Sequence, residues 1–78
     1  MAERVYTFTL TNTGQKPRTV LFYTVSGTDA QRLPAEITLL PGEQKSATFT
    51  VDDTTGEAIH AVERDGNTDV QIERTRVR

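Results

Sequence analysis

The sequence has no cysteine, no tryptophan, one methionine, one histidine and no long apolar run. Without cysteine, a disulfide and a thiolate metal site are both excluded, and a reducing compartment is permitted. No segment approaches the roughly 18 consecutive apolar residues of a membrane helix, so we expect no membrane insertion. The N-terminal residues also lack the apolar core of a secretory signal. We therefore expect a cytoplasmic location if Met1 is the native start, and an extracellular one if the sequence belongs to a larger secreted protein.

Neither sign of charge dominates the chain. Eleven acidic and nine basic residues give a net charge of −2, which provides no general attraction to nucleic acid or to an anionic membrane. The 78 residues make one domain, 1–78. A domain of this size buries only about 60% of the surface that its unfolded chain exposes, so the core must be thin. Small domains without disulfides often gain stability from a partner subunit.

What the sequence does contain is period-two alternation between short turn signals. Tyr6, Phe8 and Leu10 fall on one face of a strand and threonines on the other. The fourteen threonines also favour strands, and no segment predicts a helix. Gly27–Arg32 reads as a polar loop that ends at Leu33-Pro34. Six strands are predicted, over residues 4–11, 18–26, 35–40, 45–51, 57–64 and 68–77.

Residues 18–26 are apolar on both faces. Val20 and Phe22 share one face. The other face carries Leu21, Tyr23 and Val25. Such a strand is either central and covered on both sides, or it contacts a partner through its second face.

Turn residues separate these strands. Asn12-Thr13-Gly14 predicts a corner, because Asn and Gly tolerate positive φ, and Pro41-Gly42 has the residues of a type II turn. Asp65-Gly66 predicts a two-residue hairpin of type I′. The hairpin register pairs Ala61 with Val70, Ile59 with Ile72, Glu57 with Arg74, Ala58 with Glu73, His60 with Gln71, and Val62 with Asp69.

Short strands at regular spacing indicate an all-β fold, a small antiparallel β-sandwich of six or seven strands or a small barrel. The segments "FTLTNTG", "LPAEITLLPGEQKSATFTV" and "TTGEAIHAV" resemble the immunoglobulin-like β-sandwich modules appended to bacterial enzymes and surface proteins. They are also similar to the C-terminal modules of bacterial phospholipases. The resemblance covers about residues 6 to 63 and implies an immunoglobulin-like fold and an accessory role, with no catalytic residues to carry over.

Candidate catalytic and metal sites are few. A catalytic triad would have to use His60, but neither Ser26 nor Ser46 lies in a nucleophile-elbow context. The alternative is that His60 is a surface histidine. Carboxylates that suit Ca²⁺ occur at Asp52, Asp53 and Glu57. Their spacing matches no EF-hand loop, and turn aspartates that cap backbone amides are the alternative. We expect no catalytic residues, no metal site and no cofactor.

The C-terminal arginines form the one charged pattern. Arg74, Arg76 and Arg78 recur at period two, so a continuing strand would place them on one face. With Arg64 they are the candidate anion-binding residues, because guanidinium groups bind phosphate or carboxylate bidentately. The alternative is a solvated terminal strand whose charges discourage edge-to-edge pairing.

The sequence therefore predicts a protein without enzymatic activity. We expect an interaction or accessory module that binds a protein partner, or its own copy as a homodimer, through an exposed sheet face or an edge strand. Leu21, Tyr23 and Val25 are the candidate partner-binding residues. The alternative is a small anion- or nucleic-acid-binding protein that uses the C-terminal arginines. The acidic balance argues against nucleic acid, and nothing indicates a small-molecule substrate.

Overall fold

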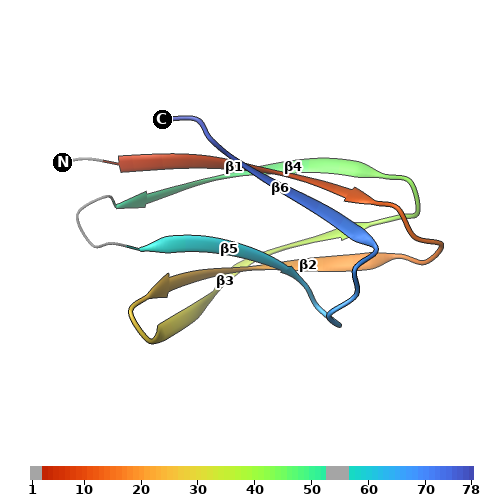
Figure 1. Cartoon of the computed structure of the whole chain (residues 1–78), viewed down its shortest axis with the longest axis horizontal. Coiled ribbons are helices and arrows are strands. Elements are labelled where there is room, and N and C mark those ends of the chain that lie inside the picture. The colour runs from red at the N-terminus through yellow and green to blue at the C-terminus, as the bar shows by residue number, and fades with distance from the viewer. Residues whose placement is uncertain (1–2, 53–56) are drawn as a thin grey trace.

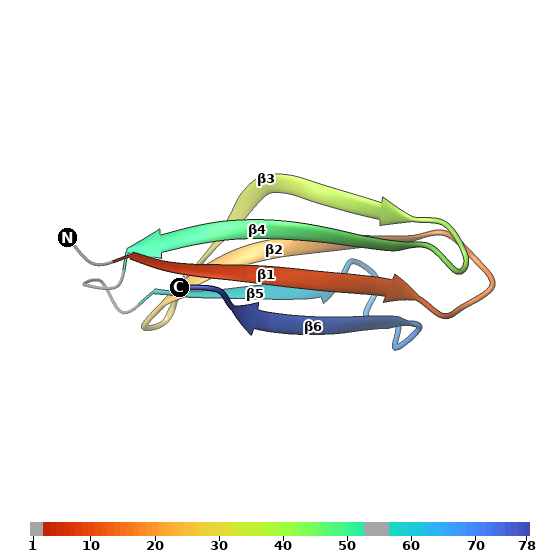
Figure 2. The same ribbon diagram turned by 90° about the horizontal axis from the view of Figure 1, so that it is seen from above.

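The computed structural model describes residues 3–52 and 57–78, and the described residues form strands and turns without a helix. The six strands are β1 (Glu3–Asn12), β2 (Arg18–Ser26), β3 (Asp29–Leu39), β4 (Gln44–Asp52), β5 (Ala58–Glu63) and β6 (Val70–Arg76). They make two antiparallel three-stranded sheets, in the orders β4-β1-β6 and β3-β2-β5. Figure 1 shows the two sheets as separate layers, and Figure 2 shows that their strands run along the same long axis. The predicted all-β sandwich is confirmed.

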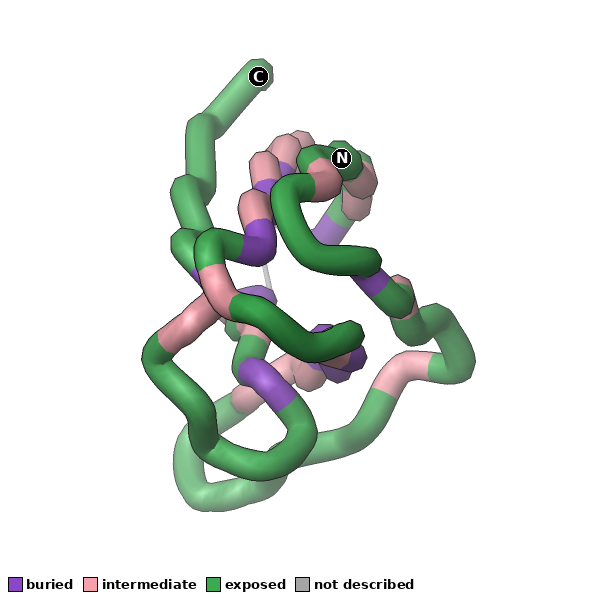
Figure 3. The backbone as a smooth tube through the Cα atoms, turned by 90° about the vertical axis from the view of Figure 1, so that its right-hand side faces the viewer, coloured by how far each residue is buried: buried purple, intermediate pink, exposed green. Residues whose placement is uncertain are grey.

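The core lies between the two layers, where the alternating residues of β1 and β2 meet. Phe8 of β1 and Phe22 of β2 contact edge to face, with ring centroids 5.6 Å apart, and Phe49 of β4 lies 4.6 Å from Phe22. Figure 3 views the sandwich end-on, with buried residues on the strands and mostly exposed connections. The predicted inward face of the first strand is confirmed, since Tyr6, Phe8 and Leu10 are all buried. Both central strands thus supply the core from one face each.

The third strand differs from the prediction. β3 begins at Asp29, because Ser26 pairs with Asp29 and only Gly27 and Thr28 remain in the turn. Gly27 has φ of 60°, and no described residue other than glycine has positive φ, so Thr28 does not. Positive φ at the first central residue alone fits a type II′ turn. The predicted loop over Gly27–Arg32 is therefore wrong. This half of β3 is exposed on both faces, so backbone pairing rather than burial holds it in place.

Pro34, which was expected to end the loop, lies within β3 at an irregularity. The register shifts by two residues between the pairs Leu21–Glu36 and Tyr23–Arg32. The additional residues of β3 bulge opposite Phe22, at the edge of the sheet. A proline is tolerated there because the missing N–H leaves no ladder bond unmade.

The predicted hairpin at Asp65-Gly66 is also wrong, because β5 and β6 lie in different sheets. β5 pairs with β2 and β6 pairs with β1. Only Gly66 of the two turn residues has positive φ, whereas a type I′ turn needs both. The N–H of Gly66 donates to the Glu63 carbonyl, so the turn is centred on Arg64 and Asp65. All six predicted residue pairs across this turn fail with it.

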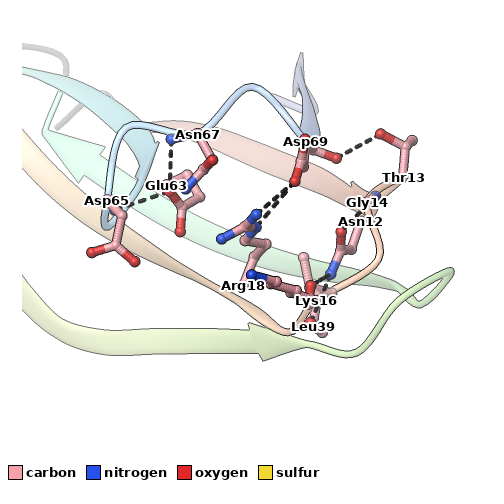
Figure 4. Close-up of polar contacts among 10 residues, drawn as sticks. All are labelled: Asn12, Thr13, Gly14, Lys16, Arg18, Leu39, Glu63, Asp65, Asn67 and Asp69. Carbon is pink, nitrogen blue, oxygen red and sulfur yellow. Dashed lines mark hydrogen bonds and ion pairs between the residues drawn. The ribbon is translucent and has the colours of Figure 1, made fainter.

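Side-chain hydrogen bonds direct the chain from one sheet to the other after β5 (Figure 4). Glu63 Oε1 accepts from the backbone N–H groups of Asp65 and Asn67, at 2.9 and 2.8 Å. Arg18 of β2 then donates to the Asp69 carboxylate at 2.7 Å. The Asp69 carbonyl accepts from the backbone N–H of Thr13, next to β1. These bonds deliver Val70 to a position opposite Asn12 and start the pairing of β6 with β1.

The Asn12-Thr13-Gly14 corner lies beside Asp69, in the same group of polar contacts. Gly14 does not adopt positive φ, contrary to the expectation. Its need for glycine is steric instead, since a Cβ there would lie 2.5 Å from Asp69 Oδ2. Pro41-Gly42 behaves as predicted: Gly42 has φ of 79° and the N–H of Glu43 donates to the Leu40 carbonyl.

We expect Glu63 to make the stability of the domain sensitive to acid. The hydrogen bonds from the backbone N–H groups of Asn67 and Asp65 lower the pKa of Glu63 from its ordinary value of 4.5. A carboxylate whose pKa is lowered by folding contributes stability above the unfolded pKa and loses that contribution as pH falls through the folded pKa. The unfolding free energy of the wild type should therefore fall below about pH 4.5 more steeply than that of Glu63→Gln.

Urea unfolding at pH 6 and pH 3 measures this difference. Glu73→Gln, which removes an exposed carboxylate of β6, is the matched control. It should keep the steep acid dependence of the wild type. An equally steep dependence in Glu63→Gln would contradict the role assigned to the turn.

Candidate protein-binding surface

The outer face of the β3-β2-β5 sheet brings together the residues that were predicted to bind a partner. Residues directly opposite one another share a face, so the register places each member of this face. We call it the Tyr23 face. Its members are Leu21, Tyr23 and Val25 on β2, Ala30, Arg32 and Glu36 on β3, and Ala58, His60 and Val62 on β5. It points away from the other sheet, and the described residues, 3–52 and 57–78, form no third layer over it.

An apolar row follows the middle of the Tyr23 face. Leu21 is only 7% exposed although it lies on the outside, while Tyr23 and Val25 are half-buried. Val62 lies opposite Leu21 and is 44% exposed. The neighbouring side chains on β3 and β5 cover the row in part. The strand at residues 18–26, β2, is therefore central in its sheet, and its second face lies on the surface of the sandwich.

Polar groups border this row on both sides. On β3, Arg32 donates to Glu36 Oε2 at 2.6 Å, and both side chains are about half exposed. On β5, His60 lies opposite Tyr23 and is exposed. An apolar centre with an aromatic residue and a polar rim is the usual composition of a protein interface.

The outer face of the other sheet is different in kind. Thr7 lies between Thr48 and Thr75, and Thr9 lies between Ser46 and Glu73. Hydroxyl groups there bond one another, as Thr7 and Thr48 do at 3.0 Å. This face is polar throughout its centre, so the two outer faces of the sandwich are chemically distinct.

The four candidate anion-binding arginines do not form one surface. Arg64 follows β5 at the end of the sandwich where Val70 lies opposite Asn12. Arg76 lies opposite Tyr6 at the other end of β6. Arg74 and Arg76 do share one face, as predicted, and it is the face that Phe8 and Tyr6 turn toward the core.

Arg74 is anchored at the side of the sandwich. Its guanidinium carbon lies 5.0 Å from the centre of the Tyr6 ring, and Nη1 donates to the Ile59 carbonyl at 3.3 Å. Arg4 also lies near this ring, and its Nη2 donates to the Glu57 carbonyl. The predicted pairing of Arg74 with Glu57 is thus replaced by contacts with Tyr6 and β5. These contacts link the two sheets beside β6.

The residues considered for catalysis are not brought together. His60 lies on the Tyr23 face, whereas Ser46 lies on the outer face of the opposite sheet. Ser26 alternates to the other side of its own sheet. No three acidic or histidine side chains among residues 3–52 and 57–78 lie close enough to hold a metal ion. Asp53 of the considered calcium cluster lies outside the described residues.

Comparison with protein-family models, with curated proteins and with solved structures finds no match to this chain. Within the part that the structure describes, there is also no helix long and apolar enough to cross a membrane.

The sequence located the central row of the Tyr23 face but missed its surroundings. Val62, Arg32 and Glu36 join the row only because β5 and β3 pair with β2 in this register. Glu36 and Val62 lie in different predicted strands with no local signal that relates them. The i, i+4 spacing of Arg32 and Glu36 is the one available clue, and it falls partly in the segment predicted as a loop.

Proposed function

We propose that this protein is a non-catalytic interaction module with an immunoglobulin-like fold, which binds a protein through the Tyr23 face. The observation that carries the proposal is an apolar row, Leu21, Tyr23 and Val25, on the outside of a two-layer sandwich. The row is partly exposed at Tyr23 and Val25, and Val62 beside it is 44% exposed. A partly exposed apolar surface with a polar rim is typical of an interaction site. Tyrosine and arginine, both present on this face, are also the residues over-represented among those that dominate binding energy.

The partner that the face fits best is a second copy of the chain. The two-fold axis would lie between the two copies, perpendicular to the strands and midway between Leu21 and Tyr23. It places Arg32 of one copy over Glu36 of the other, and the reverse. The same axis places Leu21 over Tyr23 of the partner. Charge and apolar surface are thus both self-complementary, which supports an isologous dimer with aligned sheets packed face to face.

The dimensions of the sheet limit the strength of this contact. Three strands about 4.8 Å apart and nine residues long, at about 3.3 Å per residue, make a face of about 400 Å² in projection. Stable interfaces bury about 800 Å² on each partner. We therefore expect a weak dimer that forms at concentrations above the micromolar range.

The mass in solution tests the proposal. Light scattering and NMR diffusion from micromolar to millimolar concentration should show a shift from monomer toward dimer. Tyr23→Ser removes the aromatic ring at the centre of the face and should keep the protein monomeric over the same range. Its effect on folding should be small, since Tyr23 does not face the core.

Thr9→Ser is the matched control, because it changes the outer face of the opposite sheet. It should associate like the wild type. A monomer at every concentration would exclude the second copy as the partner and leave a different protein as the occupant. Dimerisation that Tyr23→Ser leaves unchanged would contradict the use of this face.

A further inference from the structure

Among the strands that the structure describes, none pairs with the outer side of the edge strand β6. It pairs with β1 and ends its sheet, and every residue after Val70 is exposed. An edge strand of this kind offers unpaired backbone N–H and C=O groups to another extended chain. Figure 2 shows β6 at the border of the molecule, with β1 on its inner side.

The hydrogen bonds at the two ends of the ladder show which residues of β6 carry the free groups. The N–H of Thr13 donates to the Asp69 carbonyl at one end, and the N–H of Val77 donates to the Val5 carbonyl at the other. Backbone bonding alternates along an antiparallel pair, so odd-numbered residues of β6 bond to β1. The backbone groups of Ile72, Arg74 and Arg76 therefore point outward.

The side chains of these same residues lie on one face of the edge. Ile72, Arg74 and Arg76 are opposite Leu10, Phe8 and Tyr6, on the core side of the sheet. Ile72 is 38% exposed, and both arginines are exposed. A strand added beside β6 would place alternate side chains next to one apolar and two cationic groups.

The other edges are less suited to this. β3 is interrupted by the bulge that contains Pro34, and β5 is only six residues long. On β4, Lys45 Nζ donates a hydrogen bond to the Thr38 carbonyl of the opposite sheet. Among the described strands, β6 alone combines a regular free edge with a row of arginines.

We propose that β6 binds an extended acidic peptide, which adds to the β4-β1-β6 sheet as a fourth, antiparallel strand. The peptide carries carboxylates opposite Arg76 and Arg74 and an apolar side chain opposite Ile72, so its pattern is acidic-x-acidic-x-apolar. Arginine and carboxylate form short charge-assisted hydrogen bonds, and strand addition supplies main-chain bonds. This site is separate from the Tyr23 face and does not depend on it.

A second copy of β6 fits this edge poorly. Antiparallel pairing of two β6 strands would bring Arg74 and Arg76 of both copies onto the same face. Like charges beside one another on a sheet are destabilising. The arginines thus disfavour pairing between two β6 strands and favour pairing with an acidic strand. Charged side chains on edge strands commonly prevent edge-to-edge aggregation in this way.

Titration of the labelled protein with the capped peptide Glu-Thr-Glu-Thr-Val, followed by NMR, tests the proposal. Amide shifts should change along β6 and not on the Tyr23 face, and binding should weaken as salt is added. In the free protein the amides of Ile72 and Arg74 should exchange with solvent faster than those of Glu73 and Thr75. Bound peptide should slow the exchange of the first pair.

Backbone N-methylation of the peptide gives the sharpest readout. Methylation of the Glu opposite Arg74 removes a donor aimed at β6 and should weaken binding by at least about tenfold. Methylation of the intervening Thr, whose N–H points away from β6, should change binding little. Equal losses at the two positions, or no shift change on β6 at millimolar peptide, would overturn the proposal.

Charge reversal in the protein tests the side-chain half of the site. Arg76→Glu should weaken the acidic peptide by about tenfold and favour the peptide Lys-Thr-Lys-Thr-Val. Tyr23→Ser, a change on the other sheet, should bind the acidic peptide like the wild type. Loss of dimerisation and loss of peptide binding are thus measured by different variants, so either proposal can fail alone. Equal affinity of the wild type for both peptides would contradict recognition by charge.

Discussion

Phe22→Ala is expected to remove most of the stability of this domain. Phe22 is fully buried, and its ring contacts Phe8 and Phe49 from the opposite sheet. Truncation of a buried phenylalanine to alanine costs about 3–5 kcal/mol. A domain of 78 residues has a total stability of about 4–12 kcal/mol. The melting temperature should therefore fall by at least about 12 °C, and the variant should be largely unfolded if the wild type lies at the lower end of that range.

The adjacent residue supplies the matched control. Tyr23 is also aromatic but points to the outer face, where it is half-buried. Tyr23→Ala should cost less, about 1–2 kcal/mol, because the ring packs on the surface of the sheet and its loss leaves no enclosed cavity. Both variants are measured by urea unfolding at a concentration where the wild type is monomeric. Similar losses from Phe22→Ala and Tyr23→Ala would show that the two faces of β2 have been assigned wrongly.

Asn12→Ala should have the next largest effect. Asn12 is fully buried at the end of β1, and all of its amide atoms are engaged. Nδ2 donates to the carbonyls of Lys16 and Leu39, at 2.8 and 3.0 Å, and Oδ1 accepts from the N–H of Gly14 at 2.9 Å. Alanine leaves these backbone groups without their partner, at a cost of about 1–3 kcal/mol for each one that stays buried. We expect a loss of about 2–4 kcal/mol in urea unfolding, since the corner can admit water to some of them.

Asn12→Asp tests the two hydrogen bonds donated by Nδ2 separately from the one accepted by Oδ1. Aspartate keeps the oxygen that faces Gly14 but points a second oxygen at the carbonyls of Lys16 and Leu39. We expect this variant to be less stable than Asn12→Ala at pH 7 and to regain stability as the pH falls, because only the protonated acid can donate. Gln15→Ala, an exposed change in the same corner, should be nearly neutral. A small effect of Asn12→Ala would mean that Asn12 does not hold the corner between the two sheets.

The success and failure of the sequence-based predictions have different physical origins. Tyr6, Phe8 and Leu10 could be assigned to the core because one-sided burial imposes period two on β1. The first half of β3 could not be recognised, because exposed residues at an edge follow no hydrophobic period. Its sole local signal was Gly27, whose role depends on the strand pairing around it.

The hairpin error shows a second limit. Asp65-Gly66 has the composition of a tight turn, and the alternation on either side made a register plausible. The destination of β6 depends on Glu63, Arg18 and Asp69, whose contacts join residues far apart in sequence. For the same reason the sequence could place Tyr23 on an outer row but could not name Val62 or Glu36 as its neighbours. Local patterns predict faces, and the choice of neighbouring strand requires long-range contacts.

The position of β1 between β4 and β6 has a consequence for how the protein is made. β1 leaves the ribosome before the other five described strands, and both of its neighbours are encoded much later, with β6 beginning only at Val70. Of the four pairings among the described strands, the β2-β3 hairpin alone joins consecutive strands, so most of the sandwich requires distant segments to meet. Topologies of this kind fold slowly, typically in milliseconds to seconds. The nascent chain should therefore stay unfolded, and accessible to chaperones and proteases, until residue 76 has emerged from the exit tunnel.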